Sequence, residues 1–187
     1  MKRIILASSS PRRKNILKNM GLDFEIIPSS FEEIFDSDDF DYKKIEDFAY
    51  NKAKSVFLNI KFPALIIGAD TVVVYEDQIL GKPKNVNEAF EMLKKLSGNV
   101  HFVVTSVCIF DSESSAYKIL STTSYVEFFD LSDEKIIDYI ENFSPLDKAG
   151  AYGIQELPEG FVKSITGSFE NIIGLCPVAV ESLLKKI

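Results

Sequence analysis

The sequence predicts an α/β protein, with a mixed β-sheet and flanking helices. Segments with the apolar period of a helix alternate with short strand-like runs along the chain. Two long strand-like runs, at 102–110 and 119–129, are joined by a polar, serine-rich turn and predict a hairpin, which a purely parallel sheet does not contain. With 187 residues, 46% of them apolar, the chain can form one packed domain, 1–187, and no linker or internal repeat divides it.

The first half of the chain begins with a short apolar strand, a serine turn and a helix. Ser10 suits the N-cap of that helix, Pro11 its first position and Gly21 its end. Asp70 interrupts a longer apolar run, which therefore predicts two short strands rather than one. Strands are expected at 4–7, 24–28, 65–69, 71–75 and 79–80, helices at 11–20 and 42–59, and an acidic loop at 32–41.

The second half continues with a helix at 87–96, the hairpin and two further helices. Gly98 suits the end of the first of these helices. Ser132 suits the N-cap of a helix that reaches residue 141, and Pro177 suits the start of the last helix. Between them, the expected elements are a long loop with three glycines and two prolines at 144–160 and a strand at 161–165.

The charge balance argues against a nucleic-acid-binding protein. The chain has 21 basic and 28 acidic residues, a net charge of −7, whereas duplex-binding proteins usually carry a basic face. No apolar run approaches the roughly 20 residues of a membrane span, and residues 4–7 are too short a run for a signal peptide. Cys108 and Cys176 lack metal-ligand spacing and are interpreted as free thiols. We therefore expect a cytoplasmic protein with no stable nucleic-acid complex and no membrane partner.

The turn at residues 8–13, Ser-Ser-Ser-Pro-Arg-Arg, is the sharpest local feature. Backbone N–H groups at a helix N-terminus attract anions, and serine hydroxyls add further donors. Arg12 and Arg13 oppose the helix dipole, and a bound phosphate chain would account for them. A plain helix cap followed by two solvated arginines accounts for the same residues equally well.

Lys52 and Asp70 lie within apolar patterns. Lys52 falls in the middle of the apolar stripe of the helix at 42–59, where a lysine must either extend to solvent or meet an anion. Asp70 suits a metal ligand, a general base or a turn residue, and the nearby Gly68 favours the turn. Lys82 ends the hairpin that follows Asp70, so it either faces the same cleft or lies on the surface.

The loop at 147–155, Asp-Lys-Ala-Gly-Ala-Tyr-Gly-Ile-Gln, is a further candidate. Its small residues allow close backbone approach to a flat ligand, and the Gln155 amide can read the edge of a base. A flexible connection has the same composition. The one histidine, His101, has no serine or cysteine motif beside it, and the chain has no P-loop, so serine-hydrolase, zinc and P-loop chemistry are excluded.

Taken in order, these motifs resemble the Maf family of nucleotide pyrophosphatases. The resemblance covers nearly the whole chain and is carried by Leu-Ala-Ser-Ser-Ser-Pro-Arg-Arg at 6–13, Gly-Ala-Asp-Thr-Val-Val at 68–73, Gly-Lys-Pro at 81–83 and the loop at 147–155. Asn171 and the Gly-Ser and Gly-Leu pairs at 167–168 and 174–175 also fit. Cys176 departs from the family, in which proline usually follows the Gly-Leu pair directly.

The resemblance implies a Maf/inosine-triphosphatase-like fold of two lobes around a central cleft, and a homodimer. It also implies hydrolysis of a nucleoside triphosphate between the α and β phosphates with a divalent cation, Mg²⁺ or Mn²⁺. The implied catalytic residues are Asp70, Glu33, Lys52 and Lys82, and the implied substrate-binding residues are Ser8, Arg12, Arg13, Thr71 and Gln155. Glu33 and Asp70 are the implied metal ligands, and Asp70 is the implied proton acceptor.

Arg12, Thr71 and Gln155 match the branch of the family that resembles dTTP/UTP pyrophosphatases, whereas a sister branch acting on 7-methyl-GTP differs at these positions. The expected substrates are therefore dTTP, UTP and modified pyrimidine nucleotides, and the expected role is nucleotide-pool sanitation. An alternative is a nucleotide-binding regulator of cell division, because family members are often labelled septum-formation inhibitors. The presence of Asp70 and Glu33 favours catalysis without excluding this second role.

Overall fold

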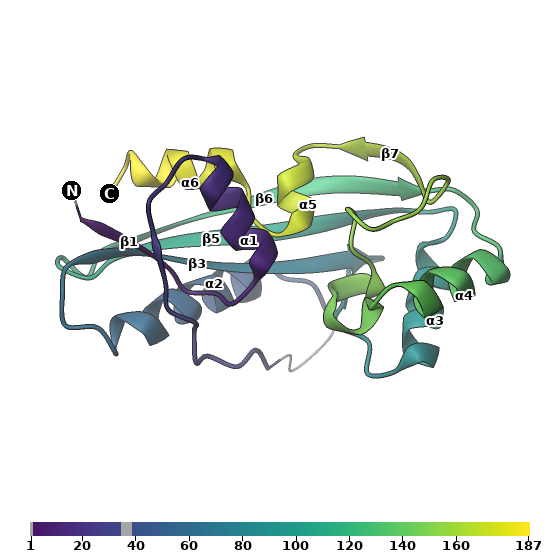
Figure 1. Ribbon diagram of the computed structural model, residues 1–187, viewed down its shortest axis with the longest axis horizontal. Helices are drawn as coiled ribbons and strands as arrows, with labels where there is room; N and C mark the ends of the chain where they lie inside the picture. Colours follow the sequence, from purple (N-terminus) through teal and green to yellow (C-terminus); the bar gives the residue numbers. More distant parts are fainter. Residues whose placement is uncertain (1, 35–38) are drawn as a thin grey trace.

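A mixed β-sheet runs the length of the molecule in the computed structural model, which describes residues 2–34 and 39–187 (Figure 1). Within these residues the sheet has seven strands in the order β2-β1-β3-β5-β6-β7, and β4 pairs with β3. The strands are β1 Arg3–Leu6, β2 Glu25–Ile26, β3 Ala64–Tyr75, β4 Gln78–Leu80, β5 Val100–Asp111, β6 Tyr117–Phe128 and β7 Val162–Thr166. The helices are α1 Pro11–Asn19, α2 Tyr42–Phe57, α3 Val86–Leu96, α4 Asp133–Asn142, α5 Phe169–Ile173 and α6 Pro177–Leu184, with 3-10 turns η1 Pro145–Asp147 and η2 Ala149–Ala151. The expected α/β class with a mixed sheet is confirmed.

The centre of the sheet is the antiparallel group β3, β5 and β6, and β3 is one continuous strand. The prediction of a break at Asp70 was wrong, because β3 stays paired with β5 throughout and Asp70 lies opposite Ser106. The turn predicted there is unnecessary, since the Asp70 carboxylate is met by a lysine from α2 instead of by solvent. The hairpin between β5 and β6 is confirmed.

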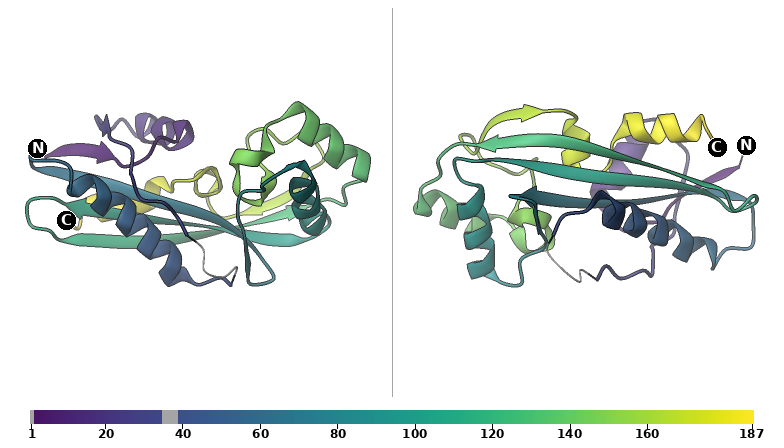
Figure 2. Two further views of the ribbon diagram at one scale, coloured as in Figure 1. Left: turned by 90° about the horizontal axis from the view of Figure 1, so that it is seen from below. Right: turned by 180° about the vertical axis from the view of Figure 1, so that it is seen from behind.

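Helices cover both faces of the sheet (Figure 2). On one face, α2 packs against Ile66 and Cys108, and on the other face α1 and α6 pack against Ile67 and Val107. The contact between α2 and β3 is unusually close, because a Cβ atom at Gly68 would lie 2.2 Å from the Ala49 carbonyl oxygen. Glycine at this position therefore lets the helix backbone approach the strand.

The two ends of the long strands carry separate apolar clusters. One end is covered by α1, α2 and α6, while α3, α4 and the 3-10 turns pack at the other end around Phe128 and Tyr139 (Figure 1). This division gives the two lobes that the sequence led us to expect.

Smaller differences from the sequence expectations involve short elements. The expected strand at 24–28 is reduced to two residues, and α5 was not expected at all. The last helix begins at Pro177 with Cys176 at its N-cap, so the extra cysteine leaves the expected start in place. Residues 35–38 of the expected acidic loop lie outside the described residues.

Candidate active site

A cleft of about 480 Å³ opens at the edge of β3, between the two lobes. Along this edge β1 pairs with β3 as far as Ile67, and β4 pairs with β3 from Val73 onward. No other strand among the described residues covers residues 68–72 on this side, and we call this stretch the bare edge of β3. The volume lies in the range of small-molecule sites. All nine residues expected from the sequence line the cleft, namely Ser8, Arg12, Arg13, Glu33, Lys52, Asp70, Thr71, Lys82 and Gln155.

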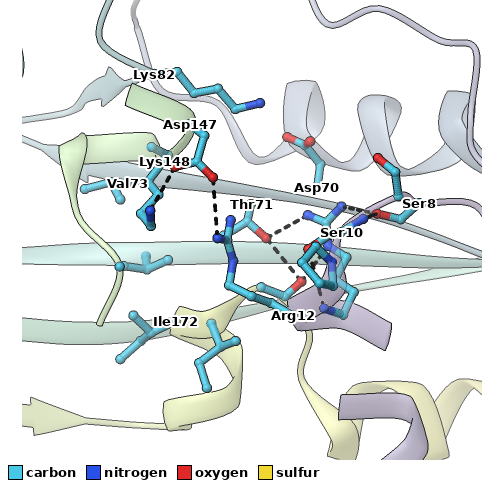
Figure 3. Close-up of a pocket in the computed structure, with 18 of the residues that line it drawn as sticks. Ser8, Ser10, Arg12, Asp70, Thr71, Val73, Lys82, Asp147, Lys148 and Ile172 are labelled. Carbon is cyan, nitrogen blue, oxygen red and sulfur yellow. Dashed lines mark hydrogen bonds and ion pairs between the residues drawn. The ribbon is translucent and has the colours of Figure 1, made fainter. Parts of the chain in front are cut away.

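The serine turn places the N-terminus of α1 at the cleft (Figure 3). Ser10 is the N-cap, and its hydroxyl accepts the N–H of Arg13 over 3.5 Å. The Ser8 hydroxyl accepts the N–H of Ser10 over 3.2 Å, which closes the turn. Pro11 occupies the first helical position, as expected. The positive end of the helix dipole and the serine hydroxyls thus face the cleft together, an arrangement that favours an anion.

Arg13 is fixed on three sides. Its Nε donates to the Gly174 carbonyl over 2.9 Å, its Nη2 to the Thr71 hydroxyl over 3.1 Å and its Nη1 to the Ser8 hydroxyl over 3.4 Å. Arg12, in contrast, is partly exposed and has one carboxylate, Asp147, 3.9 Å from its Nη1. The arrangement does not fit the alternative of two solvated arginines, because the fork of Arg13 is held at the cleft wall.

Lys52 reaches two carboxylates and not the solvent. Its residue is 8% exposed, and its ammonium donates to Asp70 Oδ1 over 2.5 Å and pairs with Glu33. Lys52 comes from α2, Asp70 from the middle of β3, and Glu33 from the segment before α2. An ion-pair triad of Glu33, Lys52 and Asp70 explains why a lysine lies in the apolar stripe of α2. The alternative that Lys52 extends to solvent is wrong.

The two carboxylates differ in proton affinity. Burial raises the pKa of Asp70 to about 6, even though the Lys52 ammonium acts in the opposite direction. For Glu33, partial burial also acts to raise the pKa, but the charge and hydrogen bond of Lys52 outweigh it and the pKa is lowered. A carboxylate with a pKa close to neutrality is suited to accept a proton, whereas one with a low pKa stays ionised.

Oxygen ligands for a divalent cation are present at this triad. Asp70 Oδ2 is buried and receives no hydrogen bond from the described residues, so one lone-pair direction remains for a cation. Glu33 supplies a second carboxylate beside it. Among residues 2–34 and 39–187 no group of three or more histidine, cysteine or acidic side chains is placed to hold a metal. The donor set therefore fits Mg²⁺ or Mn²⁺ that also takes ligands from substrate phosphates and water.

The second lobe contributes the remaining charges. Lys82 is exposed, lies across the cleft from Ser8 and Asp70, and has no acidic partner within ion-pair distance in the described chain (Figure 3). Lys148 is buried and contacts Asp147 over 2.8 Å and Glu156 over 3.2 Å. These contacts order the loop that carries Gln155, whose exposed amide makes no hydrogen bond to the described residues. The loop is thus held by its own ion pairs, contrary to the alternative of a flexible connection.

Sequence reasoning missed several residues that support the site. Thr105 contacts Thr71, whose hydroxyl accepts from Arg13, and Val103 and Ile172 form part of the cleft wall. Thr105 interrupts an apolar run in β5 just as Asp70 does in β3, and this signal could have been noticed. His101 donates to or accepts from the Tyr152 hydroxyl over 2.7 Å, so it supports the wall as a buried residue.

The chain belongs to the Maf-like protein family, whose model matches residues 3–187. A dTTP/UTP pyrophosphatase of Ruminiclostridium cellulolyticum is 45% identical, with 100% of this chain and 97% of the relative covered. Proteins of the same name from Caldicellulosiruptor saccharolyticus and a Geobacillus species are 44% and 46% identical, covering 100% and 94% of this chain and 96% and 92% of the relatives. The solved structure of the Staphylococcus aureus Ham1 protein is similar over 68% of this chain and 72% of its own, with 16% identity and a TM-score of 0.47.

Proposed function

We propose that this chain is a nucleoside triphosphate pyrophosphatase that hydrolyses dTTP, UTP and modified pyrimidine nucleotides to the monophosphate and pyrophosphate. One observation carries the proposal: the serine turn, the Glu33–Lys52–Asp70 triad and four further cationic side chains line a single cleft. These four are Arg12, Arg13, Lys82 and Lys148. The full-length relatives named dTTP/UTP pyrophosphatase support the same activity and the same substrates. Nucleotide-pool sanitation is the corresponding role.

Charge neutralisation is the main contribution of the chain to binding and catalysis. A triphosphate is strongly anionic, and its transition state spreads charge over the phosphoryl oxygens. Arg13 and the serine turn would hold these oxygens from one lobe, and Lys82 from the other. Because Arg13 is already fixed by three hydrogen bonds, it offers donors that need little reorganisation during the reaction.

Asp70 would accept a proton from the attacking water. Its raised pKa gives it the proton affinity of a general base, and its position at the bare edge of β3 faces the cleft. A divalent cation bound by Glu33 and Asp70 would polarise the phosphate and the water. Lys52 orients both carboxylates, since it pairs with each of them, and its positive charge favours the ionised form of each.

Recognition of the pyrimidine would fall mainly to Gln155, which comes from the second lobe. Gln155 presents an unpaired amide at the cleft, which can donate and accept at the edge of a base. Arg12 and Thr71 line the same cleft and complete the set that matches the dTTP/UTP branch. Val73, Val103 and Ile172 give the cleft an apolar wall suited to the face of a ring.

A cytoplasmic location and a homodimer belong to this proposal. Cys108 and Cys176 are both free and buried, which agrees with a reducing compartment. Within the described residues, no helix has the length and apolar character that crossing a membrane requires. Light scattering of the purified chain would give its oligomeric state.

The test of the activity is pyrophosphate release from a panel of nucleoside triphosphates, with Mg²⁺, with Mn²⁺ and with EDTA. We expect metal-dependent release that is fastest on dTTP and UTP. If pyrophosphate is released mainly from 7-methyl-GTP, the proposed reaction stands, but the assignment of Arg12, Thr71 and Gln155 to pyrimidine recognition is wrong. If the chain binds nucleotides but releases no pyrophosphate, the proposed enzymatic activity is wrong, and a nucleotide-binding regulator of cell division is favoured instead.

A further inference from the structure

A chain of hydrogen bonds runs from the cleft into the sheet behind Arg13. Arg13 Nη2 donates to Thr71 Oγ1 over 3.1 Å, and Thr71 Oγ1 lies 3.0 Å from Thr105 Oγ1. Thr105 Oγ1 donates in turn to the carbonyl oxygen of Asn171 over 2.8 Å. Thr71 and Thr105 face each other in the β3–β5 register, so their side chains lie on the same face of the sheet. Thr105 is fully buried and does not line the cleft.

The proton positions along this chain follow from its two ends. A carbonyl oxygen only accepts, so the single hydroxyl proton of Thr105 is committed to Asn171. Thr105 therefore accepts at its contact with Thr71, so the Thr71 proton points to Thr105 at 3.0 Å and not to the Gly174 carbonyl oxygen, which is 3.3 Å away. That proton points away from Arg13, and the Thr71 oxygen presents lone pairs to the guanidinium.

The end of the chain is anchored firmly. The Asn171 side chain is fully buried, and its Nδ2 donates to the Val103 carbonyl over 3.1 Å and to the Ser124 hydroxyl over 3.0 Å. Ser124 also donates to the carbonyl of Ser168, the N-cap of α5, over 2.9 Å. The α5 turn is thereby tied to β5 and β6. The same turn ends at Gly174, which has φ +131° and accepts Arg13 Nε.

We propose that Thr105 is a positioning residue that orients Arg13 through Thr71. In this proposal α5 holds two carbonyl oxygens in place, that of Asn171, which accepts from Thr105, and that of Gly174, which accepts from Arg13. The inference rests on the proposed function, in which Arg13 holds the phosphate chain. Thr105 orders the proton of Thr71, Thr71 then accepts one N–H of the guanidinium, and Gly174 accepts another. The rotation of the guanidinium plane is set by these contacts, so its remaining N–H groups point in a fixed direction toward the cleft. Donors fixed before the reaction stabilise the transition state more than mobile ones.

The first test compares three variants in β5. Thr105→Val keeps the shape and removes the hydroxyl, Thr105→Ser restores the hydroxyl, and Ser106→Ala is the matched control. Ser106 is equally buried, but its hydroxyl contacts Ser121 at 2.8 Å on the α2 face of the sheet and not the Arg13 chain. We expect Thr105→Val to lower kcat/KM for dTTP about tenfold relative to Ser106→Ala at a similar Tm, because both hydrogen bonds of the Thr105 hydroxyl are lost. The loss should fall more on kcat than on KM, and Thr105→Ser should recover most of it.

The second test is a double-mutant cycle with Arg13→Ala. If Thr105 acts through Arg13, Thr105→Val has no further effect once Arg13 is gone, so the two losses do not add. Additive losses would overturn the proposal. So would a Thr105→Val enzyme within twofold of Ser106→Ala, or a Thr105→Ser enzyme as slow as Thr105→Val.

A binding measurement separates this inference from the proposed function. Calorimetric titration with inorganic tripolyphosphate reports the hold of Arg13 on an anion whether or not dTTP is hydrolysed. We expect about tenfold weaker binding for Thr105→Val than for Ser106→Ala. If Thr105→Val binds tripolyphosphate more weakly than Ser106→Ala does, but the wild-type chain hydrolyses no nucleotide, the proposed function is wrong and the positioning role of Thr105 stands. Equal affinities in the two variants would overturn the positioning role alone.

Discussion

Asp70 and Glu33 share the single ammonium of Lys52 but lie in different surroundings. Asp70 is 2% exposed, and its burial raises its pKa to about 6. Glu33 is more accessible, and the Lys52 charge lowers its pKa despite partial burial. A pair of carboxylates with separated proton affinities assigns the base role to Asp70 and a permanently ionised role to Glu33.

The pH dependence of the reaction follows from the raised pKa of Asp70. A general base is active only when it is unprotonated, so kcat/KM for dTTP should rise as the pH increases through about 6 and level off above it. Initial rates at subsaturating dTTP from pH 5 to pH 8 at constant ionic strength would show this. A profile that is flat or falling over the same interval would contradict the base role of Asp70.

Asp70→Asn should abolish turnover without destabilising the fold. The folded state holds the Asp70 proton more tightly than the unfolded chain does, so the ionised carboxylate is unfavourable to folding above a pH of about 6. Asparagine removes that charge, and Lys52 keeps Glu33 as its partner. We expect kcat to fall at least about 100-fold, with a Tm at pH 8 equal to or above that of the wild type. Near-normal kcat, or a Tm several degrees lower, would count against this account.

At the scale of the element, α2 and β3 bring the triad together through backbone contact. A Cβ atom at Gly68 would lie 2.2 Å from the Ala49 carbonyl oxygen and 2.7 Å from the Ala53 nitrogen. Ala53 is the neighbour of Lys52 on α2, and Asp70 lies two residues along the strand from Gly68 on the same face. The position of the helix against the strand therefore sets the contact between Lys52 and Asp70.

Gly68→Ala should lower both stability and activity. The added methyl must push α2 away from β3, which costs on the order of 1–3 kcal/mol and separates Lys52 from Asp70. Denaturant unfolding and dTTP hydrolysis would measure the two effects. Gly81→Ala is the control for stability, because no atom lies within 4 Å of its added Cβ. Equal stability of the two variants would show that the close approach is not required.

The sequence predicted most elements and nine residues that line one cleft, but not how β3 is built. Lys52 and Asp70 were recognised because a charge inside an apolar pattern needs a partner, and the triad supplies that partner. The same charge suggested a break in β3, because pairing with the distant β5 cannot be read from local residues. For Lys82 and Gln155 the residues alone left a surface position or a flexible loop open, and the family resemblance decided between these alternatives. Glu33 followed from the resemblance alone, because an exposed acidic loop leaves no periodic signal. Thr105 was missed because its hydroxyl acts through contacts between distant segments.

At the scale of the whole molecule, the substrate would join two lobes at the bare edge of the sheet. Ser8 and Arg13 come from the lobe of α1, α2 and α6, whereas Lys82 and Gln155 come from the side of α3, α4 and the 3-10 turns. Arg12 and Asp147 face each other across this division at 3.9 Å, the one ion pair between these two groups of residues in the described chain. A triphosphate that engages Lys82 from one side and Arg13 from the other would bridge the lobes.

Lys82→Ala tests this bridge without disturbing the fold. Lys82 is exposed and has no ion-pair partner in residues 2–34 and 39–187, so its loss should leave Tm unchanged. Removal of one charged hydrogen bond to phosphate should lower kcat/KM for dTTP about tenfold or more. Lys84→Ala, a neighbouring exposed lysine that does not line the cleft, is the matched control. The bridge is wrong if both variants match the wild type in kcat/KM.

The position of bond cleavage is the most direct test of the proposed enzyme. Phosphorus NMR of dTTP incubated with the wild-type chain and Mg²⁺ would follow each phosphate as the reaction proceeds, with Asp70→Asn as the inactive control. We predict dTMP and pyrophosphate in equal amounts, with no dTDP at any time. The appearance of dTDP and orthophosphate, or an unchanged dTTP spectrum, would contradict a pyrophosphatase that attacks between the α and β phosphates.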